Sequence, residues 1–133
     1  MQDAARPLTP PQVNERVIDA VAGGAGAVIP VLPVTDTLKT VDASGVVVGT
    51  PRRSDMVAVQ TPQGFRWDVL IRAHEEGASL GADEARAATD DAGLVEAIGG
   101  TVHTVAGDER SMKVTRPLDL ALAQILVAEE TSA

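Results

Sequence analysis

Short apolar runs alternate along this chain with segments of helical periodicity, and this alternation constrains the fold more than any other feature of the sequence. The run at 27–32 is continuous and aliphatic, which is typical of a strand buried on both faces. Before it, Val13, Val17, Ile18 and Val21 recur at helical spacing. Alternating helices and strands predict an α/β fold with a mainly parallel sheet.

The other expected elements continue this alternation. The pattern predicts helices over 68–76, 91–98 and 117–129, and strands over 56–60, 101–105 and 112–114. Two strand-like segments flank the turn-forming residues 42–45, which predicts a β-hairpin arm.

Helix ends and faces can be predicted in the same way. Thr9 is the expected N-cap of the first helix, with Pro10 in the first helical position. Thr115 is the expected cap of the last helix. The inner face of that helix is expected to carry four residues: Leu118, Leu122, Ile125 and Leu126.

Composition excludes several classes of function. With 133 residues, 44% of them hydrophobic and only Phe65 and Trp67 aromatic, the chain is expected to form one domain with an aliphatic core. Its net charge of −8 argues against nucleic-acid binding. The most apolar stretch, 20–34, is interrupted by glycines and prolines, so no membrane contact is expected. The absence of cysteine fits a reducing cytoplasm, which is the predicted location.

Two superficially attractive motifs do not support a site. The glycine-rich segment 23–26 closes a helix and enters a strand, which is the reverse of the order in a phosphate-binding loop. His74 and His103 have no second ligand at metal-binding spacing, so no metal-ligating residue is predicted.

The candidate chemistry rests on scattered charged and hydroxyl residues. Lys39 and Lys113, the only lysines, follow or interrupt strand-like segments, so either anion contact or a solvated charge explains them. Asp3 and Arg6 follow a possible strand end, where ligands bind in open α/β sheets, although a simple turn pair has the same spacing. Thr89 reads most simply as a helix cap.

Five short motifs add a family resemblance. They are DAARP at 3–7, VTDTLK at 34–39, TPQGF at 61–65, TDDA at 89–92 and KVTRPLDLA at 113–121. In this order and spacing they resemble the 2-C-methyl-D-erythritol 4-phosphate cytidylyltransferases, over essentially the whole chain. The resemblance implies a partial Rossmann-like nucleotidyltransferase fold. Residues 1–133 would form the C-terminal part of one domain, with the β-arm at about 37–62.

The resemblance also implies a reaction. CTP and methylerythritol phosphate would be joined with Mg²⁺ present, releasing pyrophosphate and forming the cytidine diphosphate derivative of the non-mevalonate isoprenoid route. The arm would reach across a homodimer. Two alternatives stay open: a ribitol 5-phosphate cytidylyltransferase, and a catalytically silent dimerisation or binding fragment.

Site residues follow from the resemblance, position by position. Arg53 and Lys113 match the catalytic cations that position the substrate phosphate. Five residues match the methylerythritol phosphate site: Asp3, Arg6, Thr37, Thr61 and Thr89. Ala4 matches a backbone contact to the nucleotide. The arm residues Arg53, Thr37 and Thr61 are expected to complete the site of the neighbouring subunit.

The sequence departs from the family pattern at its beginning. The first strand and the glycine-rich nucleotide loop of the family have no counterpart here, and Gln2 stands in place of the usual histidine. One pre-aimed donor around a transferring group is worth about 2.7–4 kcal/mol. This chain alone is therefore expected to turn over CTP poorly.

Overall fold

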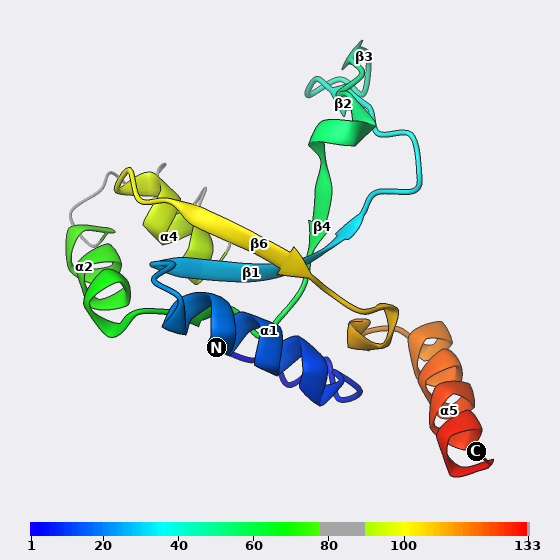
Figure 1. Cartoon of the computed structure of the whole chain (residues 1–133). Coiled ribbons are helices and arrows are strands. Elements are labelled where there is room, and N and C mark those ends of the chain that lie inside the picture. Colours follow the sequence, from blue (N-terminus) through cyan, green and yellow to red (C-terminus); the bar gives the residue numbers. More distant parts are fainter. Residues whose placement is uncertain (78–89, 133) are drawn as a thin grey trace.

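A four-stranded sheet organises the structure, a computed structural model that describes residues 1–77 and 90–132. Its central strand, β1 (Ala27–Pro33), lies parallel to β6 (Val102–Ala106) over five residue pairs (Figure 1). No helix among the described residues has the length and hydropathy needed to cross a bilayer.

The opposite edge of β1 pairs with the chain as it returns from the arm. Strands β4 (Val57–Val59) and β5 (Gly64–Phe65) both run antiparallel to β1, at its two ends. The α/β class is therefore confirmed, with a parallel ladder on one side of β1 and an antiparallel return on the other.

Helices cover both faces of this sheet (Figure 1). Helix α1 (Pro11–Ala22) packs on one face, and α2 (Trp67–Gly77) and α4 (Asp91–Ala97) pack on the other; all three helices were predicted, within a few residues. Adjacent strand residues point to opposite faces. Ala27 therefore packs with Ala73 and Val95, all three fully buried, on the side of α2 and α4.

The start of α1 differs from the prediction. Pro10, not Thr9, occupies the N-cap position, and no side chain caps the helix. The Thr9 hydroxyl instead donates to the Arg6 carbonyl oxygen at 3.1 Å. Thr9 is therefore held in the preceding turn, which removes it from the helix end.

Between β1 and β4 the chain leaves the sheet as an arm. Strands β2 (Thr40–Val41) and β3 (Val47–Gly49) pair antiparallel, and a short 3₁₀ turn, η1 (Arg53–Asp55), leads back to β4. The Asp42 carboxylate closes the hairpin by accepting from the Ser44 and Val46 amides at 2.9 and 3.0 Å.

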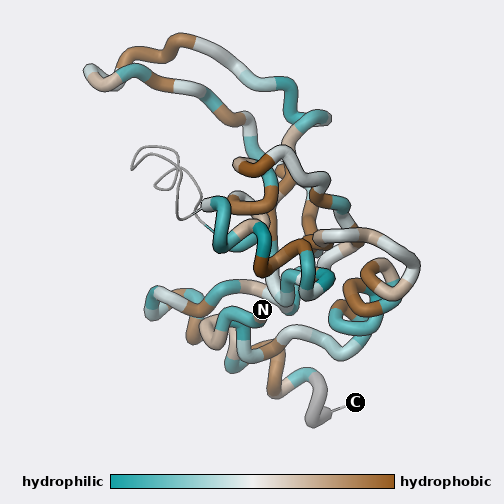
Figure 2. Tube along the Cα trace, turned by 90° about the vertical axis from the view of Figure 1, so that its left-hand side faces the viewer, coloured by the Kyte–Doolittle hydropathy of each residue, from teal (hydrophilic) through white to brown (hydrophobic). Residues whose placement is uncertain are grey.

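Apolar side chains of the arm have no cover within the described residues. Figure 2 shows apolar stretches along the arm, which extends clear of the rest of the chain. Four valines there are between 55% and 63% exposed: Val41, Val46, Val47 and Val48. The apolar character of the hairpin is therefore not explained by packing against the described residues.

After β6 the chain is irregular where a strand was predicted. A 3₁₀ turn, η2 (Glu109–Ser111), follows β6, and residues 112–114 belong to no helix or strand. The Val114 amide instead donates to the Ala5 carbonyl oxygen at 2.8 Å. The strand prediction was wrong: this segment is bonded to the N-terminal turn through Val114 and pairs with no strand among the described residues.

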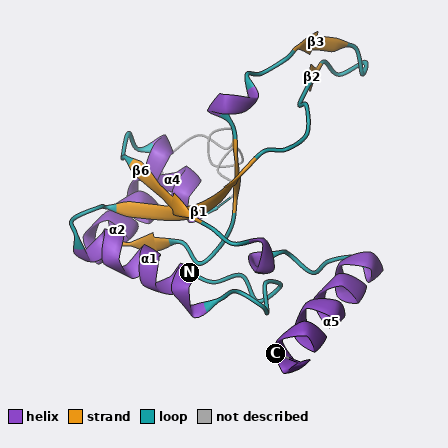
Figure 3. Cartoon of the chain, turned by 45° about the vertical axis from the view of Figure 1, so that its right-hand side comes forward, coloured by secondary structure: helices purple, strands orange, loops and turns teal. Residues whose placement is uncertain are grey.

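Helix α5 (Pro117–Ser132) lies apart from the sheet (Figure 3). The prediction of an inner face at Leu118, Leu122 and Ile125 was wrong for this chain, because these side chains are 74%, 47% and 56% exposed. Leu126, the fourth predicted member, is half-buried.

The start of α5 is fixed by Asp119 rather than capped by Thr115. Its Oδ2 accepts from the Thr115 and Arg116 amides at 3.1 and 2.9 Å. The Arg116 guanidinium beside it, together with these amides, lowers the pKa of Asp119 to about 2. Asp119 therefore stays ionised at any ordinary pH and stabilises this helix start.

Candidate functional site

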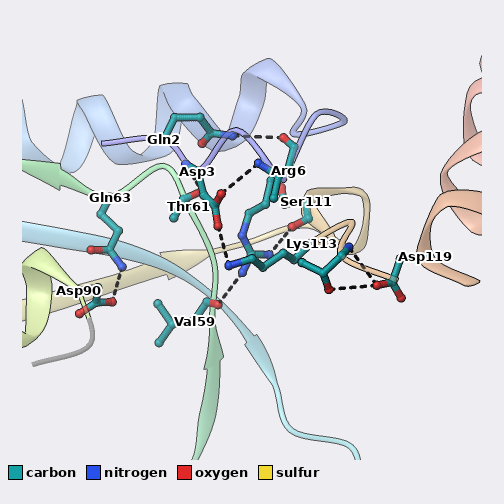
Figure 4. Close-up of polar contacts among 12 residues, drawn as sticks. Gln2, Asp3, Arg6, Val59, Thr61, Gln63, Asp90, Ser111, Lys113 and Asp119 are labelled. Carbon is teal, nitrogen blue, oxygen red and sulfur yellow. Dashed lines mark hydrogen bonds and ion pairs between the residues drawn. The ribbon is translucent and has the colours of Figure 1, made fainter. Parts of the chain in front are cut away.

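A turn at the N-terminus brings Asp3 against Lys113 (Figure 4). The Lys113 ammonium lies 2.9 Å from Asp3 Oδ2, and the Ala5 amide donates to Asp3 Oδ1 at 3.0 Å. The Ala5 amide, and after it Lys113, lowers the pKa of Asp3. Lys113 is 51% exposed. The pair is therefore ionised and open to a ligand.

Arg6 lies beneath this pair, and its charge is held by the protein itself. Its Nη1 donates to the Ser111 carbonyl oxygen at 2.5 Å and its Nη2 to the Val59 carbonyl oxygen at 3.3 Å. Its Nε is buried without a partner among the described residues. Burial lowers the pKa of Arg6, and Asp3 opposes that shift. Arg6 therefore braces two segments and adds positive charge below the site.

The return from the arm supplies the third side of the site. The Thr61 hydroxyl oxygen accepts from the Asp3 amide at 3.1 Å. A hydroxyl that accepts one hydrogen bond still carries a proton, so Thr61 can donate to a ligand oxygen. The structure thus places Asp3, Arg6, Thr61 and Lys113 together, with Ala4 exposed in the same turn.

Two other predicted site residues, Arg53 and Thr37, lie on the arm and are not part of this group. Arg53 lies on the arm, where its Nη1 donates to the Thr35 carbonyl oxygen at 2.8 Å. Thr37 is exposed in the same arm. Thr89 lies outside the described residues; Asp90, next to it, caps α4 by accepting from the Gly93 amide at 2.8 Å.

The two lysines have different surroundings. Lys39 Nζ donates to the Thr50 hydroxyl across the hairpin at 2.6 Å and makes no contact with the Asp3 group. Lys113, unlike Lys39, therefore lies beside Asp3, where both charged groups can contact a ligand.

Sequence reasoning missed two buried glutamines around the site. Gln60 and Gln63 are only 5% and 4% exposed. The Gln63 side chain donates to Asp90 at 2.7 Å, and its backbone exchanges two hydrogen bonds of 2.7 and 2.8 Å with Met1. The sequence signals were the place of Gln60 at the end of the predicted strand 56–60 and of Gln63 in the TPQGF motif; neither indicated burial, because a glutamine usually lies at the surface.

The chemical capacity of the site follows from these groups. An ammonium with a guanidinium beneath it suits a phosphate oxygen, whereas Asp3 and Thr61 suit hydroxyl groups. The described residues contain no group of three or more acidic or histidine side chains that could hold a metal ion. The arrangement fits a small hydroxylated phosphomonoester.

Comparison with known proteins agrees with this chemistry. Residues 1–129 match the family model described as 2-C-methyl-D-erythritol 4-phosphate cytidylyltransferase. A protein of that name from Rhodococcus jostii is 52% identical over 129 residues, covering 97% of this chain and 54% of the relative. One from Nocardia farcinica is 54% identical over 127 residues, covering 96% of this chain and 52% of the relative.

Solved structures give the same result. The enzyme of that name from Thermus thermophilus has a TM-score of 0.76 at 38% identity, covering 94% of this chain and 59% of that one. The Francisella tularensis enzyme has a TM-score of 0.83 at 26% identity, covering 93% and 56%. The chain thus spans about half the length of the curated relatives it matches.

Proposed function

Because this chain belongs to the 2-C-methyl-D-erythritol 4-phosphate cytidylyltransferase family, we propose that its Asp3–Lys113 site binds methylerythritol phosphate for cytidylyl transfer from CTP. The observation that carries the proposal is the 2.9 Å Lys113–Asp3 pair, which is ionised, half-open and braced by Arg6. A cation and a hydroxyl acceptor side by side are what a polyol phosphate requires.

In the proposed reaction an oxygen of the substrate phosphate attacks the α-phosphorus of CTP in line. A new P–O–P bond forms as the bond to the β-phosphate breaks, and pyrophosphate leaves with that electron pair. Lys113 holds the attacking phosphate and neutralises its charge, and Asp3 orients a substrate hydroxyl. The protein contributes positioning and charge compensation, without a covalent intermediate.

Magnesium belongs to the proposal as a companion of CTP. The ion would be bound mainly by the nucleotide phosphates, where it would neutralise charge on the triphosphate. A cytoplasmic location, where CTP is made, is also proposed, and the cysteine-free sequence suits it.

Titration of the 133-residue chain with candidate phosphates tests this function. Methylerythritol 4-phosphate is expected to bind at least about tenfold more tightly than ribitol 5-phosphate or inorganic phosphate, because Asp3 and Thr61 select hydroxyl positions. Isothermal titration calorimetry measures all three. Tighter ribitol phosphate binding would reassign the substrate, and binding of none of them would favour a silent fragment.

We further propose that the arm completes the site of a second copy of this chain in a homodimer. The exposed valines of the arm support this, since pairing would bury them. Arg53 and Thr37 lie on the arm, apart from the Asp3 group of their own chain, and would add a cation and a hydroxyl to the neighbour's site.

Mixed dimers test the sharing of sites. Arg53→Ala and Lys113→Ala chains are each expected to lose methylerythritol phosphate binding. A mixture refolded in equal amounts should regain about one quarter of the wild-type sites, because half the dimers are hybrid and each has one intact site. Calorimetric stoichiometry gives the result, and a mixture that regains no sites would contradict the shared site.

A further inference from the structure

Beyond the backbone hydrogen bond from Gly107 to Val31, the segment between β6 and Lys113 is held largely by side chains. Arg16 donates to the carbonyl oxygens of Ala106 and Gly107 at 2.8 and 3.2 Å. Further along, Arg6 donates to the Ser111 carbonyl oxygen. Between these two anchors lies Asp108, and its partner is Gln60.

Gln60 acts on Asp108 as a second peptide group would. Its Nε2 donates to the Asp108 carbonyl oxygen at 2.8 Å, and its Oε1 accepts from the Asp108 amide at 3.0 Å. The Gln60 side chain is buried, and the Gln60 backbone amide donates to the Pro30 carbonyl oxygen at 2.8 Å. One residue therefore joins the sheet edge to the segment after β6.

From Asp108 the constraint passes directly toward the site. The Asp108 carbonyl oxygen also accepts from the Ser111 amide at 2.9 Å, and its carboxylate accepts from the Arg110 amide at 2.9 Å. Ser111 is completely buried. Because η2 is fixed at Asp108 and Ser111, the direction of the backbone that follows it is also fixed. Lys113 lies two residues further along this backbone.

We propose that Gln60 is a positioning residue that sets Lys113 opposite Asp3, by fixing Asp108 through its paired side-chain hydrogen bonds. That Gln60 matters for binding a phosphomonoester rests on the function proposed above, whereas its effect on the position of Lys113 does not. Gln60 touches neither Lys113 nor Asp3 in the structure and acts only through the backbone between them.

Gln63 provides a matched control. It is a second buried glutamine, three positions along the chain, and its side chain contacts Asp90 rather than the segment after β6. Gln63→Met and Gln60→Met remove the same chemical group from the same degree of burial. A general loss of buried hydrogen bonds would affect both variants alike, whereas of the two glutamines only Gln60 is bonded to the segment that leads to Lys113.

The two-lysine composition allows a direct measurement. In chain labelled with ¹³C-lysine, the ε-carbon signals of Lys39 and Lys113 are the only two, and Lys39→Arg assigns them. The Asp3→Asn variant gives the chemical shift of the Lys113 ε-carbon when its ion pair is absent. Gln60→Met is expected to move the Lys113 signal at least about half of the way to that position, and Gln63→Met to leave it in place.

Both outcomes of this experiment are decisive. An unmoved Lys113 signal in folded Gln60→Met, or an equal shift in Gln63→Met, would overturn the proposal. If Gln60→Met does not fold, Gln60→Glu keeps the shape and the acceptor, loses the donor to Asp108, and must still shift the signal. No ligand is added in this experiment. If the wild-type chain failed to bind methylerythritol phosphate, that result would therefore contradict the proposed function and leave the role of Gln60 unaffected.

Discussion

Lys113→Met is expected to weaken methylerythritol phosphate binding by about 10- to 100-fold, the range that loss of one hydrogen bond to a charged group implies. The ammonium is the one half-exposed cation beside Asp3 in the described residues, because the Arg6 guanidinium is turned toward the Ser111 and Val59 carbonyl oxygens. Calorimetric titration of the variant measures the loss.

Lys39→Met is the matched control for this loss. It removes the only other lysine, and with it the same charge, from the arm, where Lys39 contacts Thr50. The affinity of this variant for methylerythritol phosphate is expected to stay within about twofold of wild type, since Lys39 donates to Thr50 across the hairpin and contacts no residue of the Asp3 group. An equal loss in both variants would mean that net charge, rather than the Lys113 contact, governs binding.

The second large effect is expected on stability, from Gly107→Ala. A Cβ at this position would overlap Gln60 Oε1 and lie 3.0 Å from the Val31 carbonyl oxygen. The Gly107 amide donates to that same oxygen at 2.8 Å, so the backbone has little freedom to retreat. Overpacking and the loss of Gln60–Asp108 hydrogen bonds together predict a loss of about 2–4 kcal/mol.

Urea unfolding followed by circular dichroism measures this loss, and Gly49→Ala serves as its control. The Cβ of that variant would crowd only the exposed Thr40 hydroxyl, which can rotate away, so a change below about 1 kcal/mol is expected. In a Gln60→Ala background the effect of Gly107→Ala should shrink, because the clash is gone. A Gly107→Ala variant as stable as wild type would show that Gln60 moves freely.

The elements that the sequence predicted well are those whose residues pack locally or in a repeating pattern. Val13 and Val17 recur at helical spacing and are both buried under the sheet, and the turn residues at 42–45 close the hairpin as expected. The Asp3 group was named from the family resemblance, which depends on the order of short motifs. Hydrophobic periodicity carries no information about such motifs.

What the sequence could not predict depended on partners far along the chain. Gln60 and Asp108 are neighbours only because β1 pairs with a strand on each edge. The apolar residues of α5 suggested a buried face, but periodicity does not say whether anything covers it, and here Leu118 is exposed. Strand propensity at 112–114 likewise could not reveal that the Val114 amide would donate to Ala5, at the other end of the chain.

The way the chain is tethered after β6 has a consequence for how this region tolerates change. A sheet fixes every residue in register, so one insertion displaces all that follow. Here Arg16, Gln60 and Arg6 hold separate points, and the exposed Glu109 lies between two of them. Substitutions at such intervening positions can therefore accumulate without moving Lys113, because the backbone on either side of them is held independently.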